Sequence, residues 1–542
     1  MSGLPEIAMT SQTEIELKFL VPQAARARVA AELARGSGPF ERVSLAAMYL
    51  DTDDRRIARA AMAWRVRREG RRWIQTLKGG TANMLERFEH EVIRPDATPD
   101  ASEHAGTTLG DELISILRQA QADGVEAGVR FRTQVRCTTR RIRARGAVVE
   151  VALDEGHVIS ADARLRIREI EIELVSGSPV AMLVLAERWR KRFGLIYDPR
   201  SKAERGDRLA EGMPYPPVRK ASVPDYPVDA SAIGAFGCVL DECLSQITRN
   251  AIGLIDGDPG QRIEHVHQLR VGIRRLRSAL RSFRGWVPSP PEQLEQGLRS
   301  LFLVLGMARE SDVLGTGVMA DLGKVDGPPV TLPPIPAGPD PAVAVAAADT
   351  QHMLLGWIAW RVALAQPCID MPARTDAAPP DAQGPAAVNA DPAAGEAPEA
   401  VRAVLNDPQA FHRNAERRLR RWHARIAADW KSFDELDEAG LHALRKRIKR
   451  QRYAVECFSP FMRKRHVRRY LGVLAAIQDR MGELNDLFVA RTRFRALTPS
   501  DPAAWFALGW LAARITEQRA LAKPELGRLA KAGLPAASRV KG

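Results

Sequence analysis

Residues 13–19 (TEIELKF), near the start of the 542-residue chain, constrain the fold more than any other stretch. The charged residues Glu14, Glu16 and Lys18 alternate with apolar residues, which is the two-residue period of a β-strand. One face of this strand is therefore apolar, and the other carries two carboxylates and an ammonium group. Alternating strands of this kind are common on solvated sheet surfaces, so this stretch alone assigns no function to its charged face.

The same alternation recurs through residues 11–210. Period-two runs at 14–20, 64–68, 73–78, 87–93, 148–154 and 167–175 predict strands, and two helices are predicted at roughly 22–35 and 180–193. The charged positions of these strands carry both signs. Two arrangements fit this pattern: a flat sheet with one solvated face, or a barrel with a polar lumen and an apolar outside that helices cover.

A lumen with both signs of charge has a chemical use. A triphosphate carries about four negative charges, so arginine and lysine side chains are needed to hold it. Carboxylates do not bind phosphate, but they bind Mg²⁺ or Mn²⁺ through oxygen ligands. Acidic and basic residues that face one another across a pore therefore suit phosphoryl transfer, and a stabilising role alone explains them poorly.

Six short motifs in the same order identify a resemblance of residues 12–208 to the CYTH domain, the triphosphate tunnel fold. They are Glu14-Ile15-Glu16-Leu17-Lys18, Tyr49-Leu50-Asp51-Thr52, the pair Arg65 and Arg67, Thr76-Leu77-Lys78, Glu169-Ile170-Glu171-Ile172-Glu173, and Ser201-Lys202-Ala203-Glu204-Arg205-Gly206. The resemblance implies an antiparallel β-barrel whose lumen binds a triphosphate together with Mg²⁺ or Mn²⁺.

The resemblance also implies roles for individual residues. The metal ligands would be Glu14, Glu16, Glu169 and Glu171, with Asp154 as a further acidic candidate. The catalytic residues would be Glu14, Glu16, Lys18 and Lys78, and the substrate-binding residues Lys18, Arg65, Arg67, Lys78, Arg132, Arg141, Lys202 and Arg205. Glu173 is expected to have either a structural role or a role around the metal ligands without binding the metal directly. The arginines at 164, 166 and 168 alternate with these glutamates and are expected to point outward.

The pattern changes after a proline-rich stretch at about 211–229. From residue 232 onward it is helical, and it contains an internal repeat in which residues 267–277 (HQLRVGIRRLR) match residues 442–452 (HALRKRIKRQR). Residues 324–346 and 366–400 are predicted to be loops or an insertion, because they are rich in Pro, Ala, Gly and Asp. The expected domains are 11–210, a linker at 211–230, a helical domain at 231–510 with an insertion at about 366–400, and a C-terminal tail at 511–542.

Each copy of the repeat places its basic residues on one face of a helix, because they recur at steps of three and four. Such a face can be a solvated surface, but like charges at this spacing destabilise a helix unless an anion compensates them. The pattern resembles the CHAD domain, which implies two duplicated four-helix units that bind inorganic polyphosphate. The residues implied are His267, Arg270, Arg274, Arg277, Arg281, His442, Arg445, Lys446, Lys449 and Arg452.

The totals agree with an anionic ligand. The net charge is +14, and the sequence pI near 9.9 indicates a polyanionic partner. The five scattered cysteines form no metal-binding pattern and no C-x-x-C motif. They therefore fit a reducing cytosol. No signal peptide or membrane segment is predicted, since residues 353–365 form too short an apolar run and contain Arg361. We therefore expect a cytoplasmic protein, associated with polyphosphate granules if the helical domain binds that polymer.

The combination of the two resemblances implies a metal-dependent enzyme that hydrolyses inorganic triphosphate to pyrophosphate and phosphate. Two alternatives stay open. One is a nucleoside triphosphatase, thiamine triphosphatase or adenylate cyclase, and the other is a non-catalytic protein bound to polyphosphate granules. Nucleic acid is not an expected ligand, because the basic helices lack the interleaved aromatic residues with which single-strand binders stack on bases.

Overall fold

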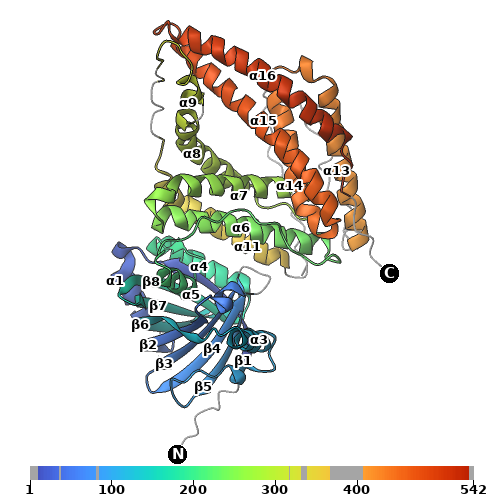
Figure 1. The fold of residues 1–542 in the computed structure, drawn as a ribbon. Coiled ribbons are helices and arrows are strands. Elements are labelled where there is room, and N and C mark those ends of the chain that lie inside the picture. The colour runs from blue at the N-terminus through green and yellow to red at the C-terminus, as the bar shows by residue number, and fades with distance from the viewer. Residues whose placement is uncertain are drawn as a thin grey trace, which may run out of the picture.

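The N-terminal half of the protein is a closed antiparallel barrel of eight strands (Figure 1). The computed structural model describes residues 10–35, 38–80, 85–316, 318–330, 332, 338–365 and 407–535. The strands are β1 (Thr10–Leu20), β2 (Phe40–Thr52), β3 (Met62–Glu69), β4 (Arg72–Gly80), β5 (Glu86–Arg94), β6 (Ala127–Ala144), β7 (Ala147–Ser160) and β8 (Ala163–Gly177). They are ordered β5-β4-β3-β2-β6-β7-β8-β1, and pairing of β1 with β5 closes the barrel. The short β9 (Ile196–Tyr197) pairs antiparallel with the end of β1.

The alternation of β1 decides which side of the barrel is polar. Leu17 and Phe19 are buried in an apolar layer outside the barrel, which α1 (Arg26–Arg35) and α4 (Pro179–Phe193) cover. The helix α3 (Thr108–Ala122) packs over β4, where Leu113 joins a second apolar cluster; the short α2 (Arg56–Arg59) lies beside it. The charged residues of β1 therefore face the lumen, and the predicted barrel with a polar interior is confirmed.

One end of the barrel is closed by α5 (Lys202–Ala210), a helix that the sequence analysis did not predict. Its residue Leu209 packs with Phe131, Val158 and Ile167 in a small apolar cluster between the strands. Gly206 lies so close to the ring of Phe131 that a Cβ atom there would be 2.1 Å from a ring carbon. This contact fixes how α5 sits against β6, and it places the first turn of α5 beside the lumen.

The described part of the C-terminal half is helical and consists of two units of four long helices each, as predicted. The first unit contains α6 (Ala232–Asp256), α7 (Arg262–Ser282), α8 (Glu292–Thr316) and α11 (Ala348–Ala365), with the short α9 (Val318–Leu322) and α10 (Pro341–Ala346). The second contains α13 (Pro408–Lys431), α14 (Glu438–Phe458), α15 (Lys464–Leu497) and α16 (Ala504–Lys531). The helices α7 and α14, which carry the repeated motif, are in contact across the two units.

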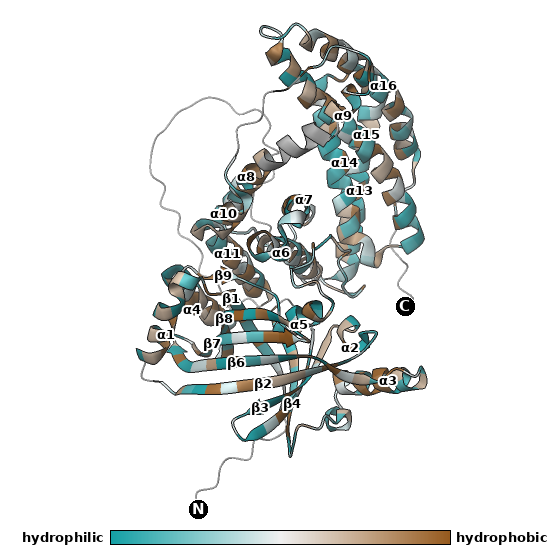
Figure 2. Cartoon of the chain, turned by 60° about the vertical axis from the view of Figure 1, so that its left-hand side comes forward, coloured by the Kyte–Doolittle hydropathy of each residue, from teal (hydrophilic) through white to brown (hydrophobic). Residues whose placement is uncertain are grey.

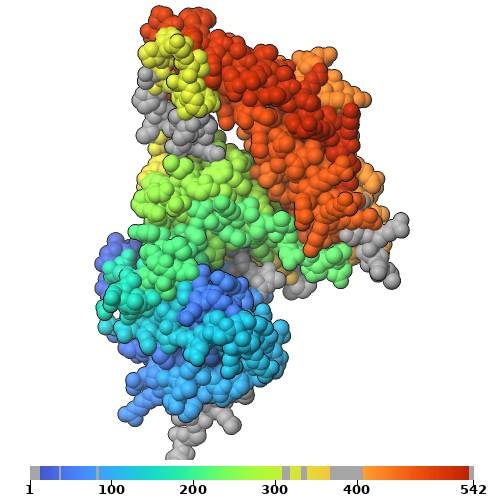
Figure 3. All heavy atoms as spheres, in the orientation of Figure 1, coloured from blue at the N-terminus to red at the C-terminus, as the bar shows by residue number. Residues whose placement is uncertain are grey.

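The helical half is packed against the barrel. Leu355 and Ile358 of α11 are buried in the apolar layer outside the barrel, and α11 lies against α4. The backbone N–H of Tyr197 in β9 donates to Gln351 Oε1 at 2.9 Å. Figure 3 shows the green α6 and α7 region seated directly on the blue and cyan barrel. Figure 2 shows that hydrophobic residues gather where the helices face one another and the barrel.

Two predictions about the helical half need correction. Residues 511–531 were expected to be a tail, but they form most of α16, in which Leu511, Leu526 and Leu529 are buried. Residues 341–346 belong to α10 rather than to a loop. The predicted insertion at 366–400 lies outside the described residues. Among the described residues, no helix is both long and apolar enough to span a membrane.

Candidate active site

The lumen of the barrel holds a cavity of ≈ 700 Å³. Its walls come from all eight strands and from the start of α5, and they carry carboxylate and cationic side chains in equal number. The charged lining residues are Glu14, Lys18, Glu41, Arg65, Arg67, Glu69, Arg71, Arg72, Lys78, Arg87, Glu89, Glu91, Arg141, Glu150, Asp154, Glu171, Glu173 and Lys202. The sequence motifs that lie far apart along the chain thus meet in one cavity.

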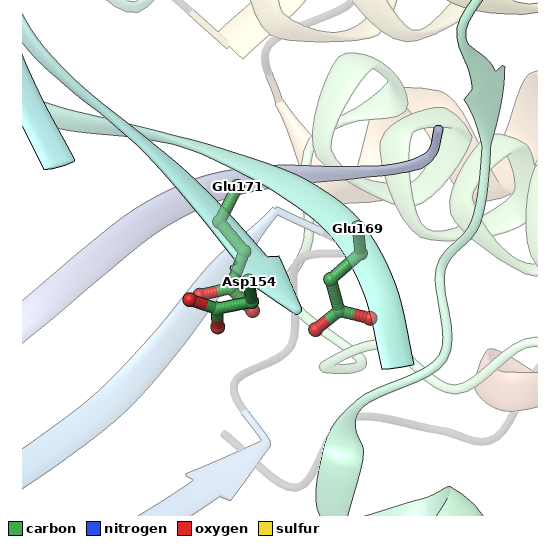
Figure 4. A group of neighbouring side chains, drawn as sticks. All are labelled: Asp154, Glu169 and Glu171. Carbon is green, nitrogen blue, oxygen red and sulfur yellow. The ribbon is translucent and has the colours of Figure 1, made fainter. Parts of the chain in front are cut away.

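Three carboxylates form the most compact group near the closed end of the cavity (Figure 4). Asp154 on β7 is the register partner of Glu169 on β8, and Glu171 follows on the same face of β8. One oxygen from each of the three lies within 4.8 Å of the others. The ammonium of Lys202 contacts all three, at 2.6 Å from Asp154, 2.6 Å from Glu169 and 2.9 Å from Glu171.

The charges of this group are strongly coupled. Burial of Asp154, together with its neighbours Glu171 and Glu169, raises the pKa of Asp154, although Lys202 acts in the opposite direction. Burial would also raise the pKa of Glu171, but contacts with Lys18 and Lys202 hold that pKa well below its ordinary value. Burial would lower the pKa of Lys202, whereas the three carboxylates raise it well above its ordinary value. Lys202 and Glu171 are therefore both charged at neutral pH.

The charged face of β1 joins this group to the opposite wall. Lys18 Nζ lies 2.6 Å from Glu16 Oε2 and 2.8 Å from Glu171 Oε1, so it bridges β1 and β8. Glu14 accepts from Lys78 of β4 at 2.8 Å. Glu14 and Glu16 thus have cationic partners of their own and do not belong to the compact group of three carboxylates. The predicted metal ligands are divided between two neighbouring parts of the lumen.

A basic wall lies across the lumen on β3 and β4. Arg65 is 3.8 Å from Glu89 and 3.9 Å from Glu91 of β5, and its Nη1 lies 3.4 Å from the hydroxyl of Tyr49. Arg67 is 3.6 Å from Glu91 and forms a closer ion pair with Glu69. The Nε atom of each of these two arginines is buried and donates no hydrogen bond of good geometry, so both guanidinium groups retain donor capacity toward a ligand in the cavity.

Several charged residues that line the cavity were not assigned a role from the sequence, among them Arg87. Arg87 of β5 lines the cavity and lies 3.3 Å from Glu16 Oε1. Its position on the same strand face as Glu89 and Glu91 was a signal that could have identified it. Glu173 also lines the cavity, and burial, together with the nearby Glu14, raises its pKa to about 8.

Three residues that were predicted to bind the substrate lie in three different places: outside the barrel, in the cavity and behind its lining. Arg132 is exposed on the outer face of β6, because its neighbour Thr133 is the residue that lines the lumen; its assignment to the substrate site is therefore wrong. Arg141 does line the cavity, at a more exposed position where it pairs with Glu150 at 3.0 Å. Arg205 is buried behind the lining and contacts Glu169, so it supports that carboxylate from outside the cavity.

The compact group of carboxylates fits a divalent cation. Its donors are all oxygen atoms, which are the ligands that Mg²⁺ and Mn²⁺ prefer. Asp154 Oδ1 is buried and accepts no hydrogen bond of good geometry, whereas Glu169 Oε1 already lies 2.6 Å from Lys202 Nζ. Buried carboxylate oxygens in this state are costly unless a cation binds them. Asp154, Glu169 and Glu171 would hold such an ion, although Asp154 was only a secondary candidate from the sequence.

The helical half presents a second set of basic residues. His267, Arg270, Arg274 and Arg277 lie half-buried along α7, whereas Arg281 at its C-terminal end is exposed. Burial and the proximity of Arg281, Arg425 and Arg447 lower the pKa of Arg450 on α14. The basic faces of the two repeats therefore influence one another electrostatically. The remaining predicted residues, His442, Arg445, Lys446, Lys449 and Arg452, lie along α14.

Some of these basic residues also contact protein groups. Arg270 donates to the carbonyl of Phe302 at 2.8 Å, and its guanidinium lies 4.1 Å from the centroid of that ring. Arg452 donates to Glu456 at 3.0 Å, and His442 Nδ1 lies 3.2 Å from Asn485 Oδ1. These contacts hold the side chains in defined positions along the two helices.

Comparison with known families gives two matches. A model of the CYTH domain matches residues 12–206, and a model of the CHAD domain matches residues 238–495. The chain therefore consists of a CYTH domain followed by a CHAD domain. Proteins with a CYTH domain act as triphosphatases or cyclases.

Solved structures show similarity to each half. The CHAD domain from the plant Ricinus communis is 24% identical, with a TM-score of 0.41, and the match covers 59% of this chain and 99% of that one. HpAC1 from Hippeastrum, which was named as an adenylyl cyclase and is described as having a dominant triphosphatase activity, is 19% identical over 37% of this chain and 96% of that one, with a TM-score of 0.25. The inorganic triphosphatase NE1496 is 19% identical over 32% of this chain and 79% of that one, with a TM-score of 0.15.

Proposed function

We propose that this protein hydrolyses inorganic triphosphate to pyrophosphate and orthophosphate in the barrel lumen. The observation that carries the proposal is the cavity of ≈ 700 Å³, in which an acidic group of three carboxylates faces a basic wall. A phosphate chain needs the basic wall, and a cation that accompanies it needs the carboxylates. Tyr49 is the single aromatic among the described residues that line the cavity, so no pair of rings is present there to hold a nucleobase.

The basic residues would bind and orient the substrate. Arg65 and Arg67 carry donors suited to non-bridging phosphate oxygens, and Lys78 adds a point charge between them and Glu14. Lys18 and Lys202 would approach the phosphate chain from the acidic side, where each already contacts Glu171. In the transition state these cations would stabilise the charge that spreads over the equatorial oxygens of the phosphoryl group.

The acidic residues would hold the cofactor and keep the lumen electrostatically balanced. Asp154, Glu169 and Glu171 would bind Mg²⁺ or Mn²⁺, and Glu14 and Glu16 would support the ion from β1. A divalent cation bound there would supply positive charge to the phosphoryl oxygens and lower the pKa of a bound water. Arg205 would orient Glu169, and Arg87 would orient Glu16, through the contacts described above.

The helical domain would bind inorganic polyphosphate along α7 and α14. The half-buried arginines of α7 and the depressed pKa of Arg450 support this role, because crowded cations are stabilised by an anion. In a cell this binding would associate the protein with polyphosphate granules. On this assignment the tunnel domain is residues 11–210, the linker 211–230, and the polyphosphate-binding domain 231–531.

A panel of substrates tests the catalytic proposal. The purified full chain is incubated with tripolyphosphate, ATP or thiamine triphosphate, with Mg²⁺ or Mn²⁺, and released phosphate is measured from neutral to alkaline pH. We expect the highest kcat/KM with tripolyphosphate, and we expect no phosphate release without a divalent ion. Preference for ATP or thiamine triphosphate, or formation of cyclic AMP, would instead identify the alternative enzymes.

Glu171→Ala separates the enzyme from a non-catalytic granule protein. It is expected to abolish turnover and leave polyphosphate binding intact, because Glu171 lies in the lumen and the polyphosphate residues lie on α7 and α14. The matched control is Glu517→Ala on α16, which removes an exposed carboxylate far from the lumen. Absence of phosphate release from every substrate would contradict the catalytic proposal.

A further inference from the structure

The helical domain contacts the barrel at the end that α5 closes. Arg249 of α6 forms an ion pair with Glu204 of α5, with 2.6 Å between Nη1 and Oε1. Asp256, the last residue of α6, forms a second ion pair with Arg200 at 2.7 Å. Figure 2 shows α5 lying between the barrel and α6. One helix of the CHAD domain therefore holds the segment that leads into α5 and α5 itself.

The segment before α5 is rigidly held in this interface. Arg200 donates to both carboxylate oxygens of Asp198 at 2.8 Å, and the two side chains are only 3% and 2% exposed. Burial would raise the pKa of Asp198, but Arg200 lowers it, so the pair stays ionised at neutral pH. A buried ion pair is stable only when its geometry is well satisfied. Asp256 supplies the third partner of this arrangement from the helical side.

The held helix carries two residues of the candidate active site. Lys202 contacts Asp154, Glu169 and Glu171, and Arg205 contacts Glu169. Because α5 has only nine residues, it has little stability of its own, and its orientation depends on the contacts around it. Glu204 lies between Lys202 and Arg205 in the sequence. A contact that fixes Glu204 therefore fixes the direction in which both cations point.

We infer that the CHAD domain is a structural part of the barrel's active site, with Arg249 and Asp256 as positioning residues that hold Lys202 and Arg205 against the acidic group. The inference rests on the proposed function of the lumen. It assigns the helical domain a role in catalysis that is separate from binding polyphosphate.

The position of the cavity supports the inference that the CHAD domain acts on the site through α5. Its lining extends from α5 at Lys202 to the turn between β3 and β4 at Gly70. Figures 1 and 2 both show the β3–β4 hairpin at the side of the barrel away from the helical domain. The end of the lumen at Gly70 therefore does not face α7 and α14. The helical domain acts on the site through α5, and it does not pass a bound phosphate chain directly into the lumen.

Arg249→Ala in the full chain tests the inference. Loss of the ion pair is expected to speed amide hydrogen exchange in residues 202–210 while β2 and β3 exchange at the unaltered rate. The KM for tripolyphosphate is expected to rise about tenfold, as is typical when an outer contact of a site residue is lost. The charge-reversed double variant Arg249→Glu with Glu204→Arg is expected to restore both values, because it re-forms the pair with the opposite polarity. Arg528→Ala, which removes an exposed pair on α16, is the control and is expected to change neither.

The outcomes separate this inference from the proposed function. If the unaltered protein hydrolyses no triphosphate, the proposed function fails, and hydrogen exchange in α5 still decides whether α6 holds that helix. Unchanged exchange in residues 202–210 would overturn the inference. So would an increase spread evenly over the barrel that the charge-reversed pair does not reverse, since this would indicate general destabilisation. Asp256→Asn gives an independent second variant and is expected to act in the same direction.

Discussion

Replacing Lys202 with methionine would test the electrostatics of the lumen at its centre. The substitution removes one ammonium and keeps an apolar stem of similar length. Three carboxylates lose a contact of 2.6, 2.6 and 2.9 Å in a single step. The three carboxylates, each of which has an oxygen within 4.8 Å of the others, would then repel one another without their shared cation.

The expected cost follows from burial. Removing one partner of a buried ion pair costs about 3–5 kcal/mol, because an uncompensated charge remains. Lys18 still contacts Glu171 and Arg205 still contacts Glu169, so the lower end of about 3 kcal/mol applies here. For a domain of this size that free energy lowers the barrel's Tm by about 6–12 °C at pH 7 in a chelating buffer.

The loss of stability in Lys202→Met should depend on pH and on divalent metal in defined directions. In the unaltered protein the pKa of Glu171 is depressed, so its contribution to stability is present above the ordinary pKa of a glutamate and lost as pH falls through the folded value. The variant lacks part of that contribution, so the two proteins should converge in stability as the pH is lowered. A divalent ion can replace the missing charge, and saturation at a hundred times Kd would restore about 2.7 kcal/mol.

Thermal unfolding of both proteins, with EDTA or with Mn²⁺, measures these effects. Lys523→Met is a matched control, because it removes an exposed lysine that pairs with Asp434 on the far unit. We expect Mn²⁺ to stabilise Lys202→Met more than the unaltered protein. Equal Tm values in EDTA, or equal stabilisation by Mn²⁺, would refute the assignment of the three carboxylates as a cation site.

Three further outcomes can be measured. Arg87→Ala should raise the KM for tripolyphosphate about tenfold with little change in Tm, because Arg87 lines the cavity and supports Glu16; an unchanged KM would contradict this. Burial and the adjacent His90 lower the pKa of the fully buried His104 to about 4, so the neutral form is required for folding. About 3 kcal/mol of stability should be lost as pH falls from 6.5 to 4, and His104→Gln should flatten that profile in urea titrations. Truncation after Asp501 should expose the core of the second unit and make it sensitive to proteolysis, since α16 buries Leu511 and Leu526; unchanged resistance would show that α16 is dispensable.

The barrel and its charged lumen could be predicted because their signal is local. Alternation in β1, β3, β4, β5, β7 and β8 places the charged residues on one face, and this holds whatever the neighbouring strands are. The strands β2 and β6 were harder to recognise, because arginines of β6 such as Arg132 and Arg136 lie on the outer face and hide the apolar alternation. The error at Arg132 has the same origin, because a shift of one residue moves a side chain to the other face.

The composition of the acidic group depended on pairing between strands, which sequence spacing does not show. Asp154 joins the group because β7 and β8 pair it with Glu169, and nothing in the residues around Asp154 indicates that register. Similarly, α16 was missed because its mixture of small, apolar and charged residues has a weak helical period. Its burial comes from α13 and α15, which the sequence does not place beside it.

The balance of charge in the lumen bears on what enters it. Among the described residues, nine carboxylates and nine cationic side chains line the cavity, and because the pKa of Glu173 is raised to about 8, the lining is slightly positive at neutral pH. A bare triphosphate with about four negative charges would leave that balance strongly negative in a region of low dielectric. A triphosphate accompanied by one or two divalent cations would leave it close to neutral. The basic wall alone would suit a free polyanion, whereas the whole lining would suit the metal–triphosphate complex of the proposed function.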